Sequence, residues 1–342
     1  MSGGVDSSVA AALLKDSGYE VFGITLRLWP VRKEPGGCCG VSAINEAKLV
    51  AKIIQIPHYV LNFRQIFQEK VIDYFCATYL SGRTPNPCIV CNQLVKFGAF
   101  LEKAKEISAD FVATGHYAKV VKKGSFYLLR KGKDSRCDQS YFLYTLSQKQ
   151  LALLLFPLGS FTKEEVRMIA HNHSFPNAEK EASQDICFLT DSDYKKFIQK
   201  FSPQGLKPGP IYHLDGRLLG EHRGLAFYTI GQREGLGISL ANPLYVVKID
   251  RKRNALIVGE REAVFKRELE AAYVNWIGPE PTGSFFARAS IRYRSPQSRV
   301  KVVPKGRSRV KVYFAQPQFA ITPGQSVVFF KRGYVLGGGV IL

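Results

Sequence analysis

The first residues of the chain form a glycine-rich segment of a kind that binds phosphate. The segment Ser2-Gly-Gly-Val-Asp-Ser-Ser8 runs directly into the apolar stretch Val9–Leu14. Glycines let the backbone approach an anion closely, and the N-terminus of the following helix offers free N–H groups and the positive end of its dipole. The segment lacks lysine, so it is not a Walker A motif. A Gly-Gly turn with a Ser or Asp cap is the alternative interpretation, but the complete string favours a phosphate site.

Cysteines are the second group of residues suited to chemistry. Cys88 and Cys91 stand in Thr84-Pro-Asn-Pro-Cys-Ile-Val-Cys-Asn92, and Cys187 stands in Ser183-Gln-Asp-Ile-Cys-Phe188. We place a helix start near Cys91 and Asn92, where the positive end of the helix lowers a thiol pKa and increases the thiolate fraction. Thiolates are the nucleophiles that sulfur chemistry requires.

Two other interpretations of the cysteines compete with this one. A C-x2-C pair is often half of a zinc site, but only Cys187, Cys38 and Cys39 remain as partners, without a second C-x2-C pair. Buried, inert thiols are the interpretation that we favour for Cys76, Cys137 and the Cys38-Cys39 pair. Seven cysteines at irregular spacing in a chain of 342 residues do not resemble a disulfide framework, which favours a reducing, cytoplasmic location.

The segments that must position these residues indicate an α/β domain. The first 200 residues alternate helical and strand-like segments, a pattern typical of a parallel sheet with helices on both faces. A phosphate loop normally follows a strand, and only Met1 precedes this one, so we expect a further strand of about six to ten residues upstream. The predicted helices are 5–15, 41–54, 66–80, 92–107, 148–156 and 163–171, and the predicted strands are 20–28, 58–63 and 110–114.

The character of the chain changes after Phe201. A breaker-rich linker, 202–210, leads into short β segments at 209–212, 244–250 and 255–258. We therefore predict three domains: 1–200 for ATP binding and catalysis, a small central linker domain at 201–263, and a C-terminal β-barrel at 264–342. The strands predicted for the barrel are 285–293, 298–303, 309–314, 326–330 and 334–341.

The charge is strongly positive and concentrated at the end of the chain. The whole chain carries a formal net charge of +20, and residues 264–342 hold 13 Lys and Arg against three Glu, a net +10. Such a surplus on a short segment is typical of a nucleic-acid-binding surface. An anionic membrane is the weaker alternative, because no basic amphipathic helix and no run of 18 apolar residues is present.

Two sets of motifs carry a resemblance to known families. Ser2-Gly-Gly-Val-Asp-Ser7 resembles the PP-loop of the N-type ATP pyrophosphatases, whose adenine nucleotide alpha hydrolase-like fold is a parallel sheet with helices on both faces. The other motifs, in the same order along essentially the whole chain, resemble the tRNA-specific 2-thiouridylase family. They are Thr84–Phe97, Ala113–Ala118, Asp138–Leu143, Leu155–Gly159, Pro176–Lys180, Ser183–Phe188, Gly220–Gly224, Phe227–Arg233, Ile291–Arg294 and Pro323–Ser326.

The resemblance implies roles for individual residues. Cys91 matches the nucleophile that forms a disulfide, and Cys187 matches the residue that carries a persulfide. The residues implied to contact ATP are Ser2, Gly3, Gly4, Val5, Asp6, Ser7, Leu26 and Gly115, with Asp6 as a Mg²⁺ ligand. The residues implied to contact tRNA are Asn86, Pro87, Cys88, His116, Cys137, Asp138, Gln139, Arg292, Tyr293 and Gln325.

Cys88 departs from the family pattern, because many members carry Asp at that position. Cys88, Cys91 and Cys187 could together hold a [4Fe–4S] cluster whose open iron binds sulfide. A persulfide relay needs only Cys91 and Cys187, and we favour the relay while the cluster stays open.

The resemblance implies a complete reaction. ATP adenylates the C2 oxygen of the wobble uridine in a tRNA anticodon stem-loop, and a Cys187 persulfide, charged by a cysteine desulfurase or a relay protein, supplies the sulfur. The products are 2-thiouridine, AMP and pyrophosphate. An amide-forming PP-loop ligase would not need the cysteine pair or the basic barrel, and a non-catalytic RNA-binding protein would not need the phosphate loop.

Overall fold

The computed structural model describes residues 1–28, 41–181, 186–189, 193–238, 240 and 242–342, and its chain divides into two compact units. The first unit comprises Met1–Ile72, Cys88–Ser192 and Arg332–Leu336. The second comprises Asp73–Pro87, Asp193–Lys331 and Gly337–Leu342. The predicted three-domain boundaries stay a prediction.

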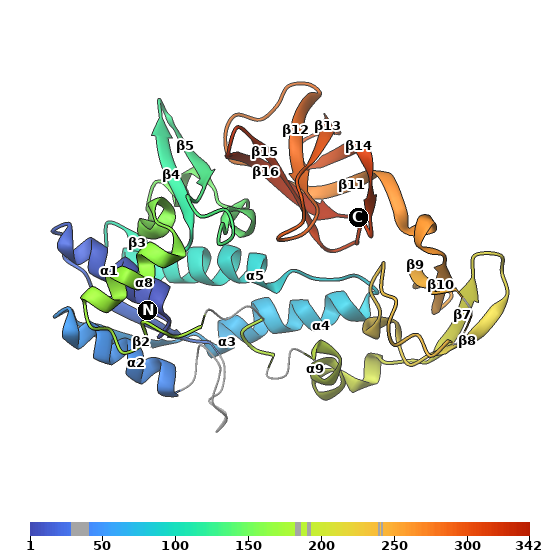
Figure 1. Ribbon diagram of the computed structural model, residues 1–342, viewed down its shortest axis with the longest axis horizontal. Helices are drawn as coiled ribbons and strands as arrows, with labels where there is room; N and C mark the ends of the chain where they lie inside the picture. Colours follow the sequence, from blue (N-terminus) through green and yellow to red (C-terminus); the bar gives the residue numbers. More distant parts are fainter. Residues whose placement is uncertain (29–40, 182–185, 190–192, 239, 241) are drawn as a thin grey trace. The chain divides into compact units, whose positions relative to one another are not determined.

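The first unit is built on short parallel strands covered by helices. Strand β1 (Gly23–Arg27) pairs in parallel with β2 (His58–Asn62), and β3 (Val112–Ala113) pairs in parallel with β6 (Leu154–Leu155). Helices α1 (Val5–Asp16), α2 (Val41–Ile53) and α8 (Lys163–Asn172) share one apolar core. Figure 1 shows α1, α2 and α8 gathered near the strands of this unit. Core side chains include Val5, Val9, Ala12, Val50, Leu158, Val166 and Phe175.

Two long predicted helices are present but subdivided. The predicted 66–80 helix corresponds to α3 (Arg64–Phe67), a π-helical segment η1 (Gln68–Ile72) and α4 (Asp73–Leu80). The predicted 92–107 helix begins earlier, at Pro87, where a proline suits the first helical turn. It runs through α5 (Pro87–Val90), the π-helical segment η2 (Cys91–Ala99) and α6 (Phe100–Glu106). The start that we placed at Cys91 and Asn92 is therefore wrong, and Cys88 occupies the first turn.

One further prediction for this region is wrong, and one pair of strands was not predicted. The predicted helix 148–156 ends after one turn, α7 (Gln148–Leu151), because the chain then forms β6 beside β3. A hairpin of β4 (Ala118–Lys123) and β5 (Phe126–Lys131) was not predicted. Short 3-10 turns connect these elements at η3 (Ser140–Leu143) and η4 (Pro157–Ser160).

The middle of the second unit is a small four-stranded sheet. Its order is β8-β7-β10-β9, with β7 (Gly209–His213), β8 (Leu218–His222), β9 (Tyr245–Asp250) and β10 (Ala255–Gly259). The core of this sheet includes Ile211, Phe227, Val246 and Leu256. Helix α9 (Tyr194–Phe201) and the turns η5 (Pro203–Gly205), η6 (Leu225–Phe227) and η7 (Arg261–Val264) complete this part.

The C-terminal strands close into a six-stranded barrel, which Figure 1 shows in orange to red. The order β11-β14-β13-β12-β15-β16 is closed by pairing between β11 and β16. Five of these strands were predicted, and β11 was not. The bounds are β11 (Phe265–Trp276), β12 (Phe285–Ser290), β13 (Ser298–Pro304), β14 (Arg309–Phe319), β15 (Ser326–Lys331) and β16 (Tyr334–Ile341).

The predicted fold class is confirmed: an N-terminal α/β domain with a parallel sheet, a central β-rich domain and a C-terminal closed barrel. Among the residues that the structure describes, no helix has both the length and the apolar composition needed to cross a bilayer.

Candidate active site

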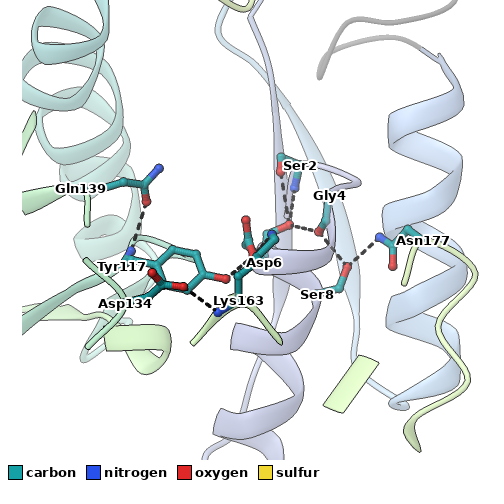
Figure 2. A network of polar contacts seen from close by, with 10 residues as sticks. Ser2, Gly4, Asp6, Ser8, Tyr117, Asp134, Gln139, Lys163 and Asn177 are labelled. Atoms are coloured by element: carbon teal, nitrogen blue, oxygen red, sulfur yellow. Dashed lines mark hydrogen bonds and ion pairs between the residues drawn. The ribbon is translucent and has the colours of Figure 1, made fainter. Parts of the chain in front are cut away.

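The phosphate loop is held in shape by its own serines. The Ser7 hydroxyl accepts a hydrogen bond from the Ser2 N–H (3.0 Å) and donates to the Gly4 carbonyl (3.0 Å). The Ser8 hydroxyl donates to the same carbonyl at 3.1 Å, as Figure 2 shows. Gly4 is the N-cap of α1, and no side chain accepts a capping hydrogen bond from the N–H groups of the first turn. These N–H groups therefore suit an anion.

Glycines allow two close approaches to this loop. Gly3 has φ +73, and a Cβ there would lie 2.4 Å from the Ala43 carbonyl oxygen. A Cβ on Gly115 would lie 2.7 Å from the carbonyl carbon of Asp6 and 2.9 Å from the Ser7 nitrogen. Glycine is therefore required at both positions. Gly115 lies two residues after the end of β3, and the structure brings the predicted nucleotide contacts of the loop and of Gly115 together. Leu26 lies half-buried near the carboxyl end of β1.

Two residues that were not predicted from the sequence bind the Asp6 carboxylate, one by a hydrogen bond and one by an ion pair. Its Oδ1 accepts a hydrogen bond from the Tyr117 hydroxyl at 2.7 Å and pairs with the Lys163 ammonium at 2.6 Å (Figure 2). Tyr117 is buried, and burial together with the Asp6 charge raises the pKa of its hydroxyl, which stays protonated as a donor. Lys163 is the first residue of α8, whose capping box joins Thr162 to Glu165. That Thr-x-x-Glu signature predicts the helix start, but it says nothing of a partner 157 positions away.

Asn177 ties the loop to a distant segment of the same unit. Its buried amide donates to the Gly3 carbonyl at 3.0 Å. The same amide donates to the Ser8 hydroxyl, also at 3.0 Å (Figure 2). Asn177 lies in the Pro176–Lys180 motif, one of those that carry the family resemblance, and these hydrogen bonds give that motif a physical role. Asn177 anchors the loop from outside α1.

The predicted catalytic thiols have contrasting environments. Cys91 is 7% exposed in the π-helical segment η2, whereas Cys187 is exposed in a turn. The neighbouring Phe188 is buried against the Phe67 ring, with 5.9 Å between ring centroids, and so anchors the turn. Of the other described cysteines, Cys76 is buried, and Cys88 and Cys137 are half-buried.

The fit of a metal differs between the two predicted centres. Mg²⁺ prefers hard oxygen ligands and usually combines one or two carboxylates with substrate phosphates, and the partly exposed Asp6 carboxylate beside the loop fits that role. Within the described part of the chain, no three His, Cys, Asp or Glu side chains gather into a metal-binding group. Cys88, Cys91 and Cys187 are thus not assembled here to hold a [4Fe–4S] cluster. Cys38, Cys39 and Ser183–Asp185 lie outside the described residues.

Several predicted tRNA contacts serve in this structure as internal supports. His116 is 9% exposed, packs against the rings of Phe97 and Phe156, and bonds to the Thr114 hydroxyl at 2.7 Å. Burial, with a smaller effect of Lys96, lowers the pKa of His116 well below its ordinary value, so the ring is neutral.

The segment Cys137–Gln139 supports Tyr117. Gln139 and Tyr117 exchange two hydrogen bonds, from the Tyr117 N–H to Gln139 Oε1 (3.1 Å) and from the Gln139 N–H to the Tyr117 carbonyl (2.9 Å). Asp138 accepts hydrogen bonds from Gly132 and Ser140. Cys137 is half-buried, and burial raises the pKa of its thiol. These contacts hold the Tyr117 hydroxyl on Asp6.

In the second unit, Gln325 supports the chain that leads to Asn86 and Pro87. Its amide donates to the carbonyls of Thr84 (3.2 Å) and Pro85 (2.9 Å), and the Thr84 N–H donates to the Pro323 carbonyl (2.9 Å). The structure therefore brings Gln325 beside the residues directly before Asn86.

Two basic regions mark the barrel. Arg292 and Arg294 are exposed, and the Arg294 guanidinium lies 5.3 Å from the centroid of the Tyr293 ring. We call the second region the outer barrel face: on β12, β13 and β14, Lys301 stands in register between the exposed Phe286 and Tyr313. Further exposed cations on these strands are Arg288, Arg299 and Arg309.

The comparisons with known proteins agree along the whole chain. Residues 1–191 match a model described as tRNA methyl transferase HUP domain, residues 195–260 a tRNA methyl transferase PRC-barrel domain, and residues 266–341 an aminomethyltransferase beta-barrel domain. The tRNA-specific 2-thiouridylase MnmA of Moorella thermoacetica is 52% identical over 100% of this chain and 98% of its own length. The chain belongs to the tRNA-specific 2-thiouridylase family.

Other 2-thiouridylases support the same conclusion. The MnmA protein of Halothermothrix orenii is 50% identical over 100% of this chain and 97% of its own length. That of Symbiobacterium thermophilum is 48% identical over 100% of this chain and 90% of its own length. The domain models are described by methyl transfer, whereas these full-length relatives are all named as thiouridylases. The resemblance inferred from the sequence motifs is therefore confirmed.

Proposed function

We propose that this protein is an ATP-dependent sulfurtransferase that converts the wobble uridine of a tRNA anticodon to 2-thiouridine. The observation that carries the proposal is the joint presence of a glycine-rich phosphate loop at the start of α1 and two cysteines, one buried and one exposed, in a chain of this family.

The first step is adenylation. The uridine C2 oxygen attacks the α-phosphorus of ATP, a new O–P bond forms, and the bond to the β-phosphate breaks to release pyrophosphate. The loop N–H groups and the α1 dipole would hold the phosphates, and Gly115 allows its own segment to pack directly against the loop backbone. Bound Mg²⁺ neutralises phosphate charge, and Asp6 is the residue that would hold it. AMP is then a good leaving group on C2.

Sulfur transfer follows in two bond exchanges. The terminal sulfur of a Cys187 persulfide attacks C2 and the C2–O bond breaks, so that AMP departs. The Cys91 thiolate attacks the Cys187 sulfur, which breaks the persulfide S–S bond and leaves the terminal sulfur on the base. The two cysteines end as a disulfide, and a dithiol reductant resets them by supplying two electrons. The exposure of Cys187 suits charging by a cysteine desulfurase or a relay protein.

The relay is preferred to the cluster because the described cysteines form no three-ligand group. Cys88 and its neighbours Asn86 and Pro87 are assigned to the target base. Seven cysteines at irregular spacing fit a reducing, cytoplasmic location.

RNA binding is assigned to the basic barrel. Arg292, Tyr293 and Arg294 supply two cations for phosphate contacts and a ring for base stacking. The outer barrel face, with Lys301 between two exposed rings, offers the same kinds of contact. An anticodon stem-loop offers splayed bases of the kind that such surfaces recognise.

Pyrophosphate release tests this function against its rivals. The purified protein is incubated with ATP and Mg²⁺, alone and with an anticodon stem-loop carrying uridine or cytidine at the wobble position. We expect release only with the uridine RNA. Release that ignores RNA but responds to ammonia would indicate an amide-forming ligase, and tight RNA binding without any release would indicate a non-catalytic binding protein.

A further inference from the structure

Lys163 occupies an unusual position for a lysine. Its side chain is 14% exposed, its ammonium lies 2.6 Å from Asp6 Oδ1, and the same ammonium lies 5.8 Å from the centroid of the Tyr117 ring. Lysine is rarely so well buried unless its charge is paired. Lys133 in the same region shows the ordinary case, since it is 48% exposed and pairs with Glu165 at the surface.

The phosphate loop itself carries no cation. Ser2–Ser8 contains neither lysine nor arginine, yet a triphosphate brings several negative charges to it. Lys163 delivers a positive charge to this loop from a helix far away in the sequence. A lysine ammonium is a compact charge on a flexible four-carbon stem, which allows it to move between oxygen partners.

The Asp6 carboxylate cannot bind the Lys163 ammonium and Mg²⁺ equally well at the same time. Two cations on one carboxylate would repel each other strongly in this partly buried place. The Tyr117 hydroxyl, fixed through Gln139, can hold Asp6 in position without the lysine. Asp134 offers Lys163 little alternative, because it already accepts hydrogen bonds from the N–H groups of Lys163 and Arg136.

We propose that Lys163 forms a binding subsite for the β- and γ-phosphates of ATP and for the pyrophosphate that they become. It leaves the Asp6 carboxylate when Mg²⁺ and ATP enter the loop, and it returns when pyrophosphate departs. Lys163 takes part in no bond exchange, so its role is to hold the leaving group and offset its charge. This inference rests on the proposed use of ATP and adds a residue to it.

Equilibrium binding separates this role from a purely structural ion pair. The ligands are α,β-methylene ATP, which cannot release pyrophosphate, then pyrophosphate and AMP, each titrated calorimetrically. We expect Lys163→Met to weaken binding of the first two by about 10- to 100-fold, the range for a hydrogen bond to a charged group. Binding of AMP should be unchanged, Lys163→Arg should recover most of the loss, and the matched control Lys133→Met should bind all three ligands normally.

A second pair of variants, Asp6→Asn with and without Lys163→Met, tests the subsite without leaving an unpaired Asp6 carboxylate that could disturb folding. Without Mg²⁺, Asp6→Asn should bind pyrophosphate more tightly than wild type, because the lysine loses its competing partner. Adding Lys163→Met to Asp6→Asn should abolish that gain. Equal weakening of AMP and pyrophosphate, or no gain with Asp6→Asn, would overturn the subsite. Failure of the wild-type protein to bind α,β-methylene ATP at all would instead overturn the proposed function.

Discussion

Replacing Gly115 with alanine tests how closely the phosphate loop is packed. The new Cβ would lie 2.7 Å from the Asp6 carbonyl carbon, 2.8 Å from its oxygen and 2.9 Å from the Ser7 nitrogen. Ordinary van der Waals contact begins at 3.4 Å, so the loop or the Gly115 segment must move by about 0.7 Å. All three neighbours are backbone atoms, which cannot turn aside as a side chain could.

The expected cost has two parts. Overpacking of this kind costs about 1–3 kcal/mol of unfolding free energy, which urea denaturation would measure. Misplacement by up to about 1 Å can reduce a catalysed rate by roughly 100-fold, so pyrophosphate release with RNA should fall by one to two orders of magnitude, by that same estimate.

The matched control is Gly283→Ala, since a Cβ at Gly283 meets no atom within 4 Å. This variant should match the wild type in both stability and pyrophosphate release. If Gly115→Ala also retained wild-type stability and turnover, the close approach between Gly115 and the loop would be contradicted.

Three further predictions concern the nucleotide, the RNA and pH. Asp6→Ala should lose ATP-dependent pyrophosphate release while still binding the RNA, as measured by filter binding; normal release would remove Asp6 from the site. Replacing Arg292 and Arg294 together with alanine should weaken RNA binding and reduce the slope of log K against log salt by about one unit per lost phosphate contact, whereas an unchanged slope would place the RNA elsewhere. Because burial lowers the pKa of His116 in the folded state, the unfolded chain binds more protons, and stability should fall as pH drops below the ordinary value of 6.5. His116→Phe should flatten this dependence in denaturation curves between pH 7 and about 5, and an undiminished slope would assign it to other groups.

Local patterns predicted most of the fold. The helices α1, α2 and α8 and the strands β1 and β2 were all predicted to within a few residues, because apolar periodicity and breakers mark them directly. The predicted helix 148–156 was wrong because its second half pairs with β3, and short apolar runs do not distinguish a strand from a buried helix. Strand β11 was missed because its exposed face carries charges next to small residues.

The candidate site was predicted only where one short segment encodes it. The phosphate loop is contiguous, so its glycines and serines could be read together. Tyr117 and Lys163 reach Asp6 from 111 and 157 positions away, and Asn177 reaches Gly3 from 174 positions away. Such partners leave no periodic trace in the sequence, and only folding brings them together. The burial of His116 also depends on two aromatic rings from other elements.

The central claim is that this chain moves sulfur from Cys187 to a tRNA uridine. The direct measurement is nucleoside mass spectrometry of an anticodon stem-loop incubated with ATP, Mg²⁺, a persulfide donor and the purified protein. The wild type should form 2-thiouridine, and Cys91→Ser and Cys187→Ser should form none while binding the RNA as tightly as the wild type. Wild-type yields of 2-thiouridine from either serine variant, or none from the wild-type protein, would contradict the account.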